Sequence, residues 1–367
     1  MNTFSFVGKL VPVKDTENFK GYTETSYDSG WMKQRLVFNV VAGDNRHFVE
    51  INAGKWKDDK KNSTIYTMSR AAEGKKSEKI QIPWEKRNDP ETIEKVAGYR
   101  VFTIDTDTYS HRESLKEAGD TEALEKSNEK RRHFLAGTDF CDFLTKKVIY
   151  NEKIKDWVFR VNGNIVYNYS EKTGKYYQSY EVNKIYRVDE SVEPTTDVNI
   201  EFYFADGFMD KDGLEDTGKA IMSGFTPFYD QNTQKNWFLP ISLVMRDVEN
   251  VDLTEELLSE FEDNEICKAV LSCKAINGAQ RRDVNLEDLD EKTQKAVKAG
   301  LMSEAQAIKN AGGQVFGEVI QEIRFDKIVK HSEATAYTLE NMSERPHKEE
   351  ESVDIFDEDE NNEDDDI

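Results

Sequence analysis

The amino-acid sequence predicts a mainly β protein, of the β-rich α+β class, with helical insertions. Short runs in which apolar and polar residues alternate recur along most of the chain, and such alternation is the pattern of a half-buried strand. Turn residues separate the runs, as at Gly43-Asp44-Asn45 and Glu171-Lys172-Thr173-Gly174. Two stretches, 111–150 and 286–310, are instead rich in Glu, Lys and Ala, which predicts helices.

The first half shows an ordered series of expected strands. Residue Pro12 closes the first of them, and the last two form the clearest hairpin in the sequence. Three strands, a helical insert and two final strands are the element order of an elaborated five-stranded OB barrel with enlarged connections. The pair near 80–104 would then belong to one connection. The strands are expected at 4–10, 35–41, 47–52, 80–84, 99–104, 158–169 and 176–188.

The second half is also β-rich, after a polar linker at 190–197 that contains Pro194. No internal sequence repeat is evident. We expect a first domain at 1–188, a second β-rich domain with helices at 189–340 and a disordered acidic tail at 341–367. A barrel related to the first, with helical insertions, would account for the second domain. The second domain should hold strands at 198–205, 219–229 and 237–245, helices at 254–261 and 286–310, and a strand pair or one long bent strand at 315–329.

Composition excludes several classes of protein. The chain has 367 residues and contains no run of about 20 apolar residues that would span a bilayer. The N-terminus lacks the basic flank and apolar core of a signal peptide. Three cysteines, Cys141, Cys267 and Cys273, are an odd number with loose spacing, so buried thiols in a reducing compartment are expected instead of a disulfide framework or a zinc site.

The net charge of −22 is unevenly distributed. Residues 1–187 hold 33 basic and 28 acidic residues, residues 188–348 hold 17 and 32, and residues 349–367 hold none and 12. The tail carboxylates repel one another, and its few apolar side chains cannot offset the entropy of ordering. Such a polyanion would compete with nucleic acid for a basic groove of the same protein; the simpler interpretation is a tail that keeps the protein soluble.

Signs of catalysis are sparse. The sequence holds no phosphate-binding glycine loop, no dinucleotide fingerprint and no nucleophile elbow. Residues Asp105 and Asp107 could hold a divalent metal as in a nuclease, although acidic pairs at strand ends are common. We therefore expect no enzyme activity, no cofactor and no metal.

Aromatic and basic residues alternate in two patches, and single-stranded nucleic acid needs this mixture because bases stack on rings while cations follow the phosphates. Sheets also favour aromatics, and the strand period buries about half of them, so Phe159, Ile165 and Val182 should lie in the core. In an OB barrel the second and third strands line the binding face. The candidates in the hairpin are Arg160, Tyr167, Tyr169, Lys172, Lys175, Tyr176, Tyr177, Tyr180 and Lys184. Those on the second strand are Trp31, Lys33, Arg35 and Phe38, and those after the third are Lys55, Trp56 and Lys57.

In these features the chain resembles the single-stranded DNA-binding proteins of replication, especially those of bacterial viruses. The final Asp364-Asp365-Asp366-Ile367 is similar to the start of the bacterial tail Asp-Asp-Asp-Ile-Pro-Phe, with Pro and Phe missing. The resemblance implies a non-catalytic binder of single-stranded DNA in replication, recombination or repair, located in the cytoplasm, that of the bacterial host if the protein is viral. It also implies that the tail recruits replication or recombination proteins through Phe356, Asp364, Asp365, Asp366 and Ile367.

Two other functions stay open. The acidic residues 188–367 suit a protein that mimics DNA and blocks a DNA-binding enzyme. A metal-dependent nuclease built around Asp105 and Asp107 is the second alternative. The basic aromatic hairpin argues against the DNA mimic.

Overall fold

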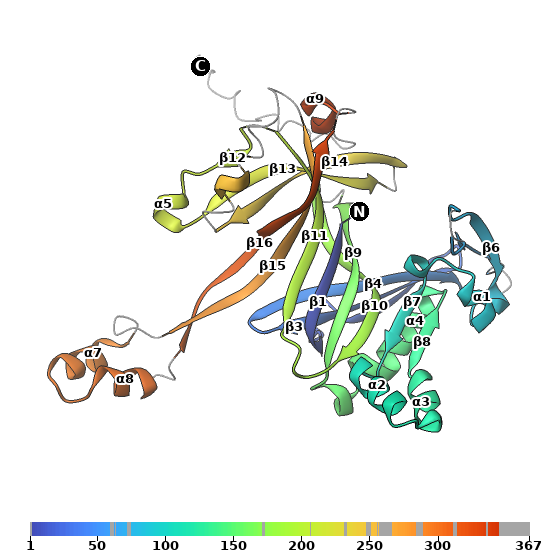
Figure 1. The fold of residues 1–367 in the computed structure, drawn as a ribbon, viewed down its shortest axis with the longest axis horizontal. Coiled ribbons are helices and arrows are strands. Elements are labelled where there is room, and N and C mark those ends of the chain that lie inside the picture. The colour runs from blue at the N-terminus through green and yellow to red at the C-terminus, as the bar shows by residue number, and fades with distance from the viewer. Residues whose placement is uncertain are drawn as a thin grey trace, which may run out of the picture.

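The computed structural model describes residues 2–58, 62, 64–71, 75–170, 173–205, 207–230, 233–246, 251–254, 256, 266–283, 289–310, 314–334 and 337–344. The predicted mainly β class is confirmed, since 14 of the 16 described strands belong to one large sheet system (Figure 1). None of the helices in these ranges has the length and apolar character to cross a membrane.

Five strands of the first half close into a barrel. Antiparallel pairs join β1 to β3, β3 to β4, β10 to β9 and β9 to β1. A parallel pair between Glu50 and Glu181 joins β4 to β10 and completes the circuit. This is the strand order of an OB barrel, as predicted. The strands are β1 (Thr3–Pro12), β3 (Trp31–Ala42), β4 (Asn45–Trp56), β9 (Val158–Ser170) and β10 (Lys175–Val188).

The second half repeats this circuit. Antiparallel pairs join β11 to β13, β13 to β14, β16 to β15 and β15 to β11, and a parallel pair between Val244 and Arg324 joins β14 to β16. In both barrels a short strand also lies along the second strand, β2 (Tyr22–Ser26) in the first and β12 (Met209–Asp210) in the second. The barrel strands are β11 (Thr195–Phe204), β13 (Ala220–Asp230), β14 (Lys235–Met245), β15 (Cys267–Asp283) and β16 (Gln314–Glu333).

The two barrels join through their first strands. Residues 3–7 of β1 pair antiparallel with residues 195–199 of β11. The contacts beyond this pair are reciprocal. The β9–β10 hairpin rests on the second barrel, where the ring of Tyr176 lies 5.2 Å from that of Phe228. The β15–β16 hairpin rests on the first barrel, where the Asn277 backbone N–H donates to Asn45 Oδ1 over 3.0 Å. The barrels are therefore related by an approximate two-fold arrangement.

Alternation along the strands explains the core. In β9 the residues Phe159, Val161 and Ile165 are buried, and polar or half-buried residues stand between them. One apolar cluster continues through both barrels and includes Phe6 and Phe202. The three thiols lie in it as predicted, and burial raises the pKa of Cys141 to about 12, of Cys267 to about 11 and of Cys273 to about 12.

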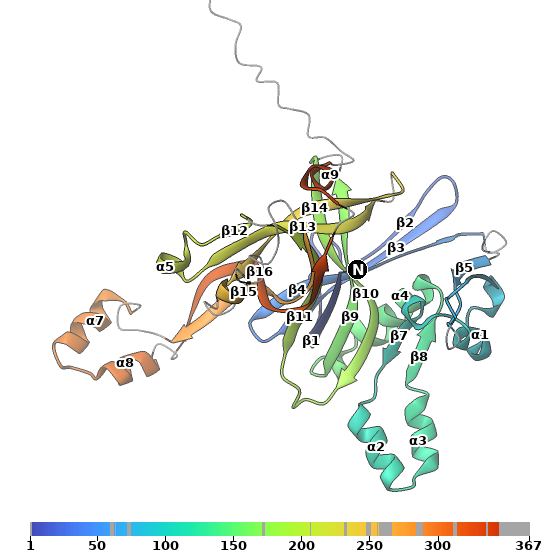
Figure 2. The ribbon, with the colours of Figure 1, turned by 45° about the horizontal axis from the view of Figure 1, so that its top comes forward.

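The long connection between β4 and β9 forms a separate projection (Figure 2). Here the predicted pairing of 80–84 with 99–104 is wrong: β6 pairs with β5, whereas β7 pairs with β8 and with β10. Thr108 and Asp120 cap the N-termini of α2 and α3. The elements are β5 (Thr64–Met68), β6 (Lys79–Pro83), α1 (Pro90–Glu94), β7 (Phe102–Asp105), α2 (Tyr109–Glu117), α3 (Thr121–Asn128), β8 (Arg131–Phe134) and α4 (Gly137–Leu144).

Beyond its contact with the first barrel, the outer part of the β15–β16 hairpin extends as an arm that carries two helices at its tip (Figures 1 and 2). Residues 315–329 belong to one long strand, one of the two predicted forms, whereas β15 was not predicted. The predicted helix at 254–261 is described only in part, with 251–254 helical and 257–261 outside the described residues. Among the described residues of this half, the helices with defined bounds are α5 (Leu214–Thr217), α7 (Glu291–Lys298), α8 (Glu304–Asn310) and α9 (Leu339–Ser343).

Candidate nucleic-acid interface

The outer surface of β3 and β4 gathers one of the two predicted patches. Cross-strand partners lie on the same side of a sheet, and the register pairs Trp31 with Trp56, Lys33 with Gly54 and Arg35 with Asn52. The two indoles meet edge to face with their ring centroids 5.2 Å apart. Trp31 occupies space that any side chain larger than hydrogen at Gly54 would need. We call the outward residues of β3, β4 and β10 the barrel face.

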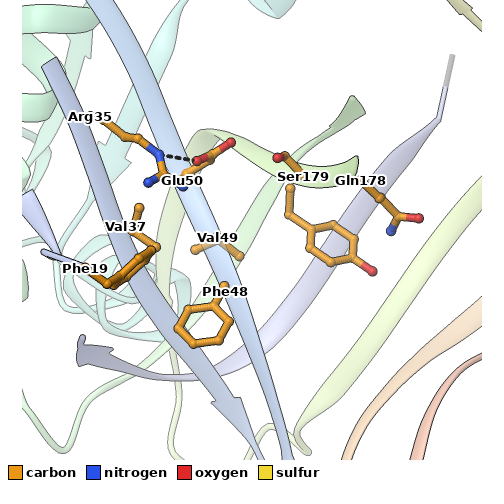
Figure 3. A pocket seen from close by; sticks show the side chains of 9 residues that line it. Phe19, Arg35, Val37, Phe48, Val49, Glu50, Gln178 and Ser179 are labelled. Carbon is orange, nitrogen blue, oxygen red and sulfur yellow. Dashed lines mark hydrogen bonds and ion pairs between the residues drawn. The ribbon is translucent and has the colours of Figure 1, made fainter. Parts of the chain in front are cut away.

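A pocket of about 430 Å³ opens on the barrel face, beside the pair of Glu50 and Glu181. We call it the seam pocket because it lies where β4 meets β10. Its walls are largely apolar, and the ring of Phe48 is 53% exposed at its rim. Figure 3 shows its lining residues, which are Phe19, Arg35, Val37, Phe48, Val49, Glu50, Gln178, Ser179 and Tyr180.

Polar groups stand at one end of the seam pocket. The Nε of Arg35 donates to a Glu50 carboxylate oxygen over 2.7 Å, and its guanidinium lies 5.7 Å from the centre of the Phe19 ring. Asn52 Nδ2 donates to Glu181 Oε1 over 3.2 Å. Burial, and the nearby charge of Glu50, raise the pKa of Glu181. The carboxylate that lines the pocket, Glu50, can accept hydrogen bonds from the amino groups of bases, so the pocket offers both stacking surfaces and an acceptor for base edges.

Two predicted contact residues point toward the core: Phe38 is part of it and Tyr180 packs against it. Phe38 is fully buried because it has the strand parity opposite to Trp31, Lys33 and Arg35. Tyr180 packs inside the first barrel, 5.2 Å from the ring of Phe4 and 5.0 Å from that of Phe6. The prediction that Phe38 stacks on bases is therefore wrong, whereas Tyr180 is only partly buried and also lines the seam pocket.

Three other hairpin tyrosines lie at the junction of the barrels. The rings of Tyr167 and Tyr176 lie 6.3 and 5.2 Å from Phe228, and Tyr169 lies 5.1 Å from Tyr176. They face a cleft of about 870 Å³ that also exposes Tyr229. This packing gives the three tyrosines a structural role that the strand pattern alone did not reveal.

The remaining predicted residues are dispersed. Tyr177 is about half exposed, and its hydroxyl donates to Thr173 Oγ1 over 2.9 Å. Lys175, Arg160 and Lys57 are exposed. Lys55 pairs with Met32 and so has the parity opposite to Trp56, whereas Lys184 lies outward on β10, paired with Thr103. Lys172, and the tail residues Phe356, Asp364, Asp365, Asp366 and Ile367, lie outside the described residues.

The carboxylates proposed for a nuclease are engaged with cations. Asp105 accepts two bonds of 2.7 Å from Arg112 and one of 2.8 Å from Arg131. Asp107 accepts bonds from Ser127 and Lys130, and His111 Nδ1 lies 3.0 Å from its carboxylate. Burial works to raise the pKa of both acids, but these bonds outweigh it and hold each pKa below its ordinary value. Within the described residues no cluster of three or more His, Cys, Asp or Glu suits a metal.

The second barrel presents no matching surface in the described residues. Next to its parallel pair of Val244 and Arg324, the outward cross-strand pairs are Ile221 with Val244 and Ser223 with Ser242. None of these side chains is aromatic. Farther along, Phe238 is buried and lies 5.0 Å from the ring of Tyr337, next to the C-terminal helix α9. Part of its aromatic surface is thus covered by the chain itself, while Tyr229 and Tyr337 stay exposed at the cleft. The combination of exposed rings with lysine and arginine on one sheet surface makes the first barrel the candidate interface.

Sequence reasoning missed several residues of the interface. Phe48 could have been found from the strand period. His47, Val49 and Ile51 point inward, so Phe48, which lies between His47 and Val49, must point outward. Glu50 and Glu181 could not be recognised, since nothing local shows that they are neighbours. Phe19 lies in a connection without periodicity.

Comparisons with known proteins give the following result. No family model matches the chain, and no curated protein matches it. Two similar solved structures are of the single-stranded DNA binding protein from Thermus aquaticus. The wild-type structure has 9% identity, covers 76% of this chain and 85% of that chain, and has a TM-score of 0.30. A deletion mutant has 9% identity, coverage of 76% and 87%, and a TM-score of 0.29. Because these TM-scores are low, the function is inferred from the geometry of this chain.

Proposed function

We propose that this protein binds single-stranded DNA without catalysis, through the barrel face of its first barrel. The observation that supports the proposal most is the combination of exposed rings and cations on one outer surface. Trp31, Trp56 and Phe48 line it beside Lys33 and Arg35. Rings stack on bases of any sequence and cations attract the phosphates, and this surface is the one that OB barrels use for oligonucleotides.

The chemistry of the seam pocket suits an unpaired base. Phe19 and Phe48 meet edge to face, with centroids 6.3 Å apart, and provide apolar surface for a ring. Arg35 and Glu50 stand beside them as donor and acceptor. A base within a duplex is stacked on both sides and cannot enter such a pocket, so the arrangement favours a single strand over duplex DNA.

The acidic tail would regulate this binding of DNA. Residues 349–367 carry 12 acidic and no basic residues, and an anionic segment tethered to the body competes with DNA for cations. We expect the tail to lower affinity for DNA and, when DNA displaces it, to become available to replication, recombination or repair proteins. Its apolar Phe356 and Ile367 would then contact the partner, with Asp364, Asp365 and Asp366 beside them.

The test is a titration of tryptophan fluorescence with oligo-dT, on the full chain and on residues 1–348, at two salt concentrations. Quenching that weakens with salt supports the barrel face, and tighter binding by residues 1–348 supports competition by the tail. Equal binding by both forms contradicts the tail mechanism alone. If neither form binds, the DNA-binding function is refuted and the acidic DNA mimic becomes the better account.

A further inference from the structure

A second cavity adjoins the barrel face and is not explained by the OB barrel. It has a volume of about 970 Å³ and lies between the β10–β7–β8 sheet and the part of the long connection that contains α1. One wall includes Lys184, Tyr186, Arg131 and His133, and the opposite wall includes Arg70. We call it the insertion groove, since the 57–157 connection builds most of it.

The strand register places the sheet residues of the groove in two rows. Lys184, Thr103 and His133 are successive cross-strand partners, and so are Tyr186, Asp105 and Arg131. Both rows lie on the same side of the sheet, because Ile185 and Ile104 between them are fully buried on the other side. Thr103 Oγ1 lies 3.0 Å from His133 Nδ1 and so orients the imidazole in its row.

The groove continues the barrel face along β10. A β-bulge between Val182 and Lys184 shifts the alternation by one residue. Val182 and Ile185 therefore both point into the core, while Glu181 before the bulge and Lys184 after it both point outward. A strand of nucleic acid that leaves the seam pocket along β10 would meet Lys184 and Tyr186 next.

Charge distinguishes this groove from the cleft between the barrels. Asp105 faces two guanidinium groups, from Arg112 and Arg131, so this cluster keeps a positive charge. Asp139 in the wall is neutralised by Arg87 at 2.7 Å. Burial and the nearby charge of Arg131 lower the pKa of His133, which keeps its ring neutral near pH 7.

The acids that remain in the groove are Glu94 and Glu129, against Arg70, Arg132, Lys184 and the arginine cluster. The cleft between the barrels is lined instead by Glu181, Glu201 and Asp230 against Arg100 and Lys268. A polyphosphate chain gains electrostatic free energy in the groove and loses it in the cleft.

We propose that the insertion groove is a second subsite for the same DNA strand. Its phosphates would lie near Arg70, Arg131 and Lys184, and Tyr186 would offer a ring to a base. This inference rests on the proposed function of the barrel face. It assigns the 57–157 connection a direct part in DNA binding. It also predicts that the protein contacts more nucleotides than one OB barrel alone would.

The test compares oligo-dT of about 5 nucleotides, which falls within the usual site size of one OB fold, with oligo-dT of about 20 nucleotides, which exceeds it. The double variant Arg70→Ala/Lys184→Ala removes two cations that line the groove and form no ion pair among the described residues. The matched control is Lys153→Ala/Lys292→Ala, two exposed lysines on other parts of the molecule.

We expect the groove variant to bind the long oligonucleotide roughly tenfold more weakly, with a salt slope lower by about 2, and to bind the short one like the native protein. Unchanged short-oligonucleotide binding also shows that the variant is folded. If the groove variant and the control bind the long oligonucleotide equally, the groove inference is refuted while the barrel face stands. If the native protein binds neither length, the proposed function itself is refuted, and the groove inference with it.

Discussion

Arg35 Nε lies 2.7 Å from a carboxylate oxygen of Glu50, and this ion pair forms the polar end of the seam pocket. Its two residues come from neighbouring strands, and Glu50 is also the residue through which β4 meets β10. The carboxylate orients the guanidinium beside Phe19, so the cation that would contact DNA is held in place before binding. Such preorganisation lowers the entropy cost of association.

Removal of the Phe48 ring should weaken DNA binding without unfolding the protein. The side chain is 53% exposed, so Phe48→Ala costs little stability, while the loss of one stacked base lowers affinity about five- to 150-fold. Affinity for oligo-dT measured by fluorescence tests this. Tyr109→Ala is the matched control, since this ring on α2 is 72% exposed and lies outside the barrel face. A loss of affinity of the same size in the control would remove the support for the seam pocket.

Neutralisation of Glu181 should strengthen binding. Its pKa is raised by burial and by Glu50, so the native protein loses this negative charge at a higher pH than an ordinary glutamate as the solution is acidified. Affinity for DNA should then rise as the pH falls through that raised pKa. Glu181→Gln keeps an acceptor for Asn52, should bind more tightly near pH 7, and should show a smaller rise on acidification. A variant that binds more weakly would show instead that the carboxylate contacts a base.

Tyr180 and Tyr177 should respond to substitution in opposite ways, although they are close in the sequence. Tyr180→Ala empties space in the core among Phe4, Phe6 and His47 and should lower the free energy of unfolding by about 3–5 kcal/mol. Tyr177→Ala removes an exposed ring and should change it by no more than about 0.5 kcal/mol. Urea denaturation of both variants measures the difference. Similar losses would contradict the inward placement of Tyr180.

His47 should make the folded state sensitive to acid. Burial lowers its pKa from 6.5 to about 4, although its hydrogen bond to the backbone of Ala275 acts in the opposite direction. Between these two values the unfolded chain binds a proton that the folded chain does not. The stability that depends on neutral His47 is therefore fully present above about pH 6.5. The free energy of unfolding then falls by up to about 3 kcal/mol as the pH drops to about 4. Denaturation at several pH values should show this fall, and His47→Phe should reduce it. An equal fall in the variant would assign the effect to other groups.

Local alternation allowed much of the first barrel to be predicted. The hairpin of β9 and β10 and the inward face of β9 follow from residue period alone, whereas the bulge in β10 does not. The same rule predicts that Phe38 is buried. Lys33 and Arg35 point outward, so the even-numbered residues of this strand must point inward. The error there came from grouping residues by nearness in the sequence instead of by strand parity.

Long-range pairing explains what could not be predicted. The β1–β11 pair joins residues nearly 200 positions apart, and neither strand carries a local sign of its partner. The contact of Tyr176 with Phe228 across the two barrels is of the same kind. Strand β15 escaped prediction because its residues 274–283 include Lys, Asn, Gly, Gln and two Arg, which weaken the apolar alternation. The repeated barrel order is likewise a property of pairing and not of local sequence.

Oxidative footprinting of exposed side chains, with and without saturating oligo-dT, tests the barrel face most directly. Bound DNA should protect Trp31, Trp56 and Phe48 and leave Tyr109 and Leu301 unchanged, since these last two are exposed on other parts of the molecule. Protection of Tyr229 and Tyr337 at the cleft between the barrels, with Phe48 and the two tryptophans unchanged, would contradict the assignment of binding to the first barrel.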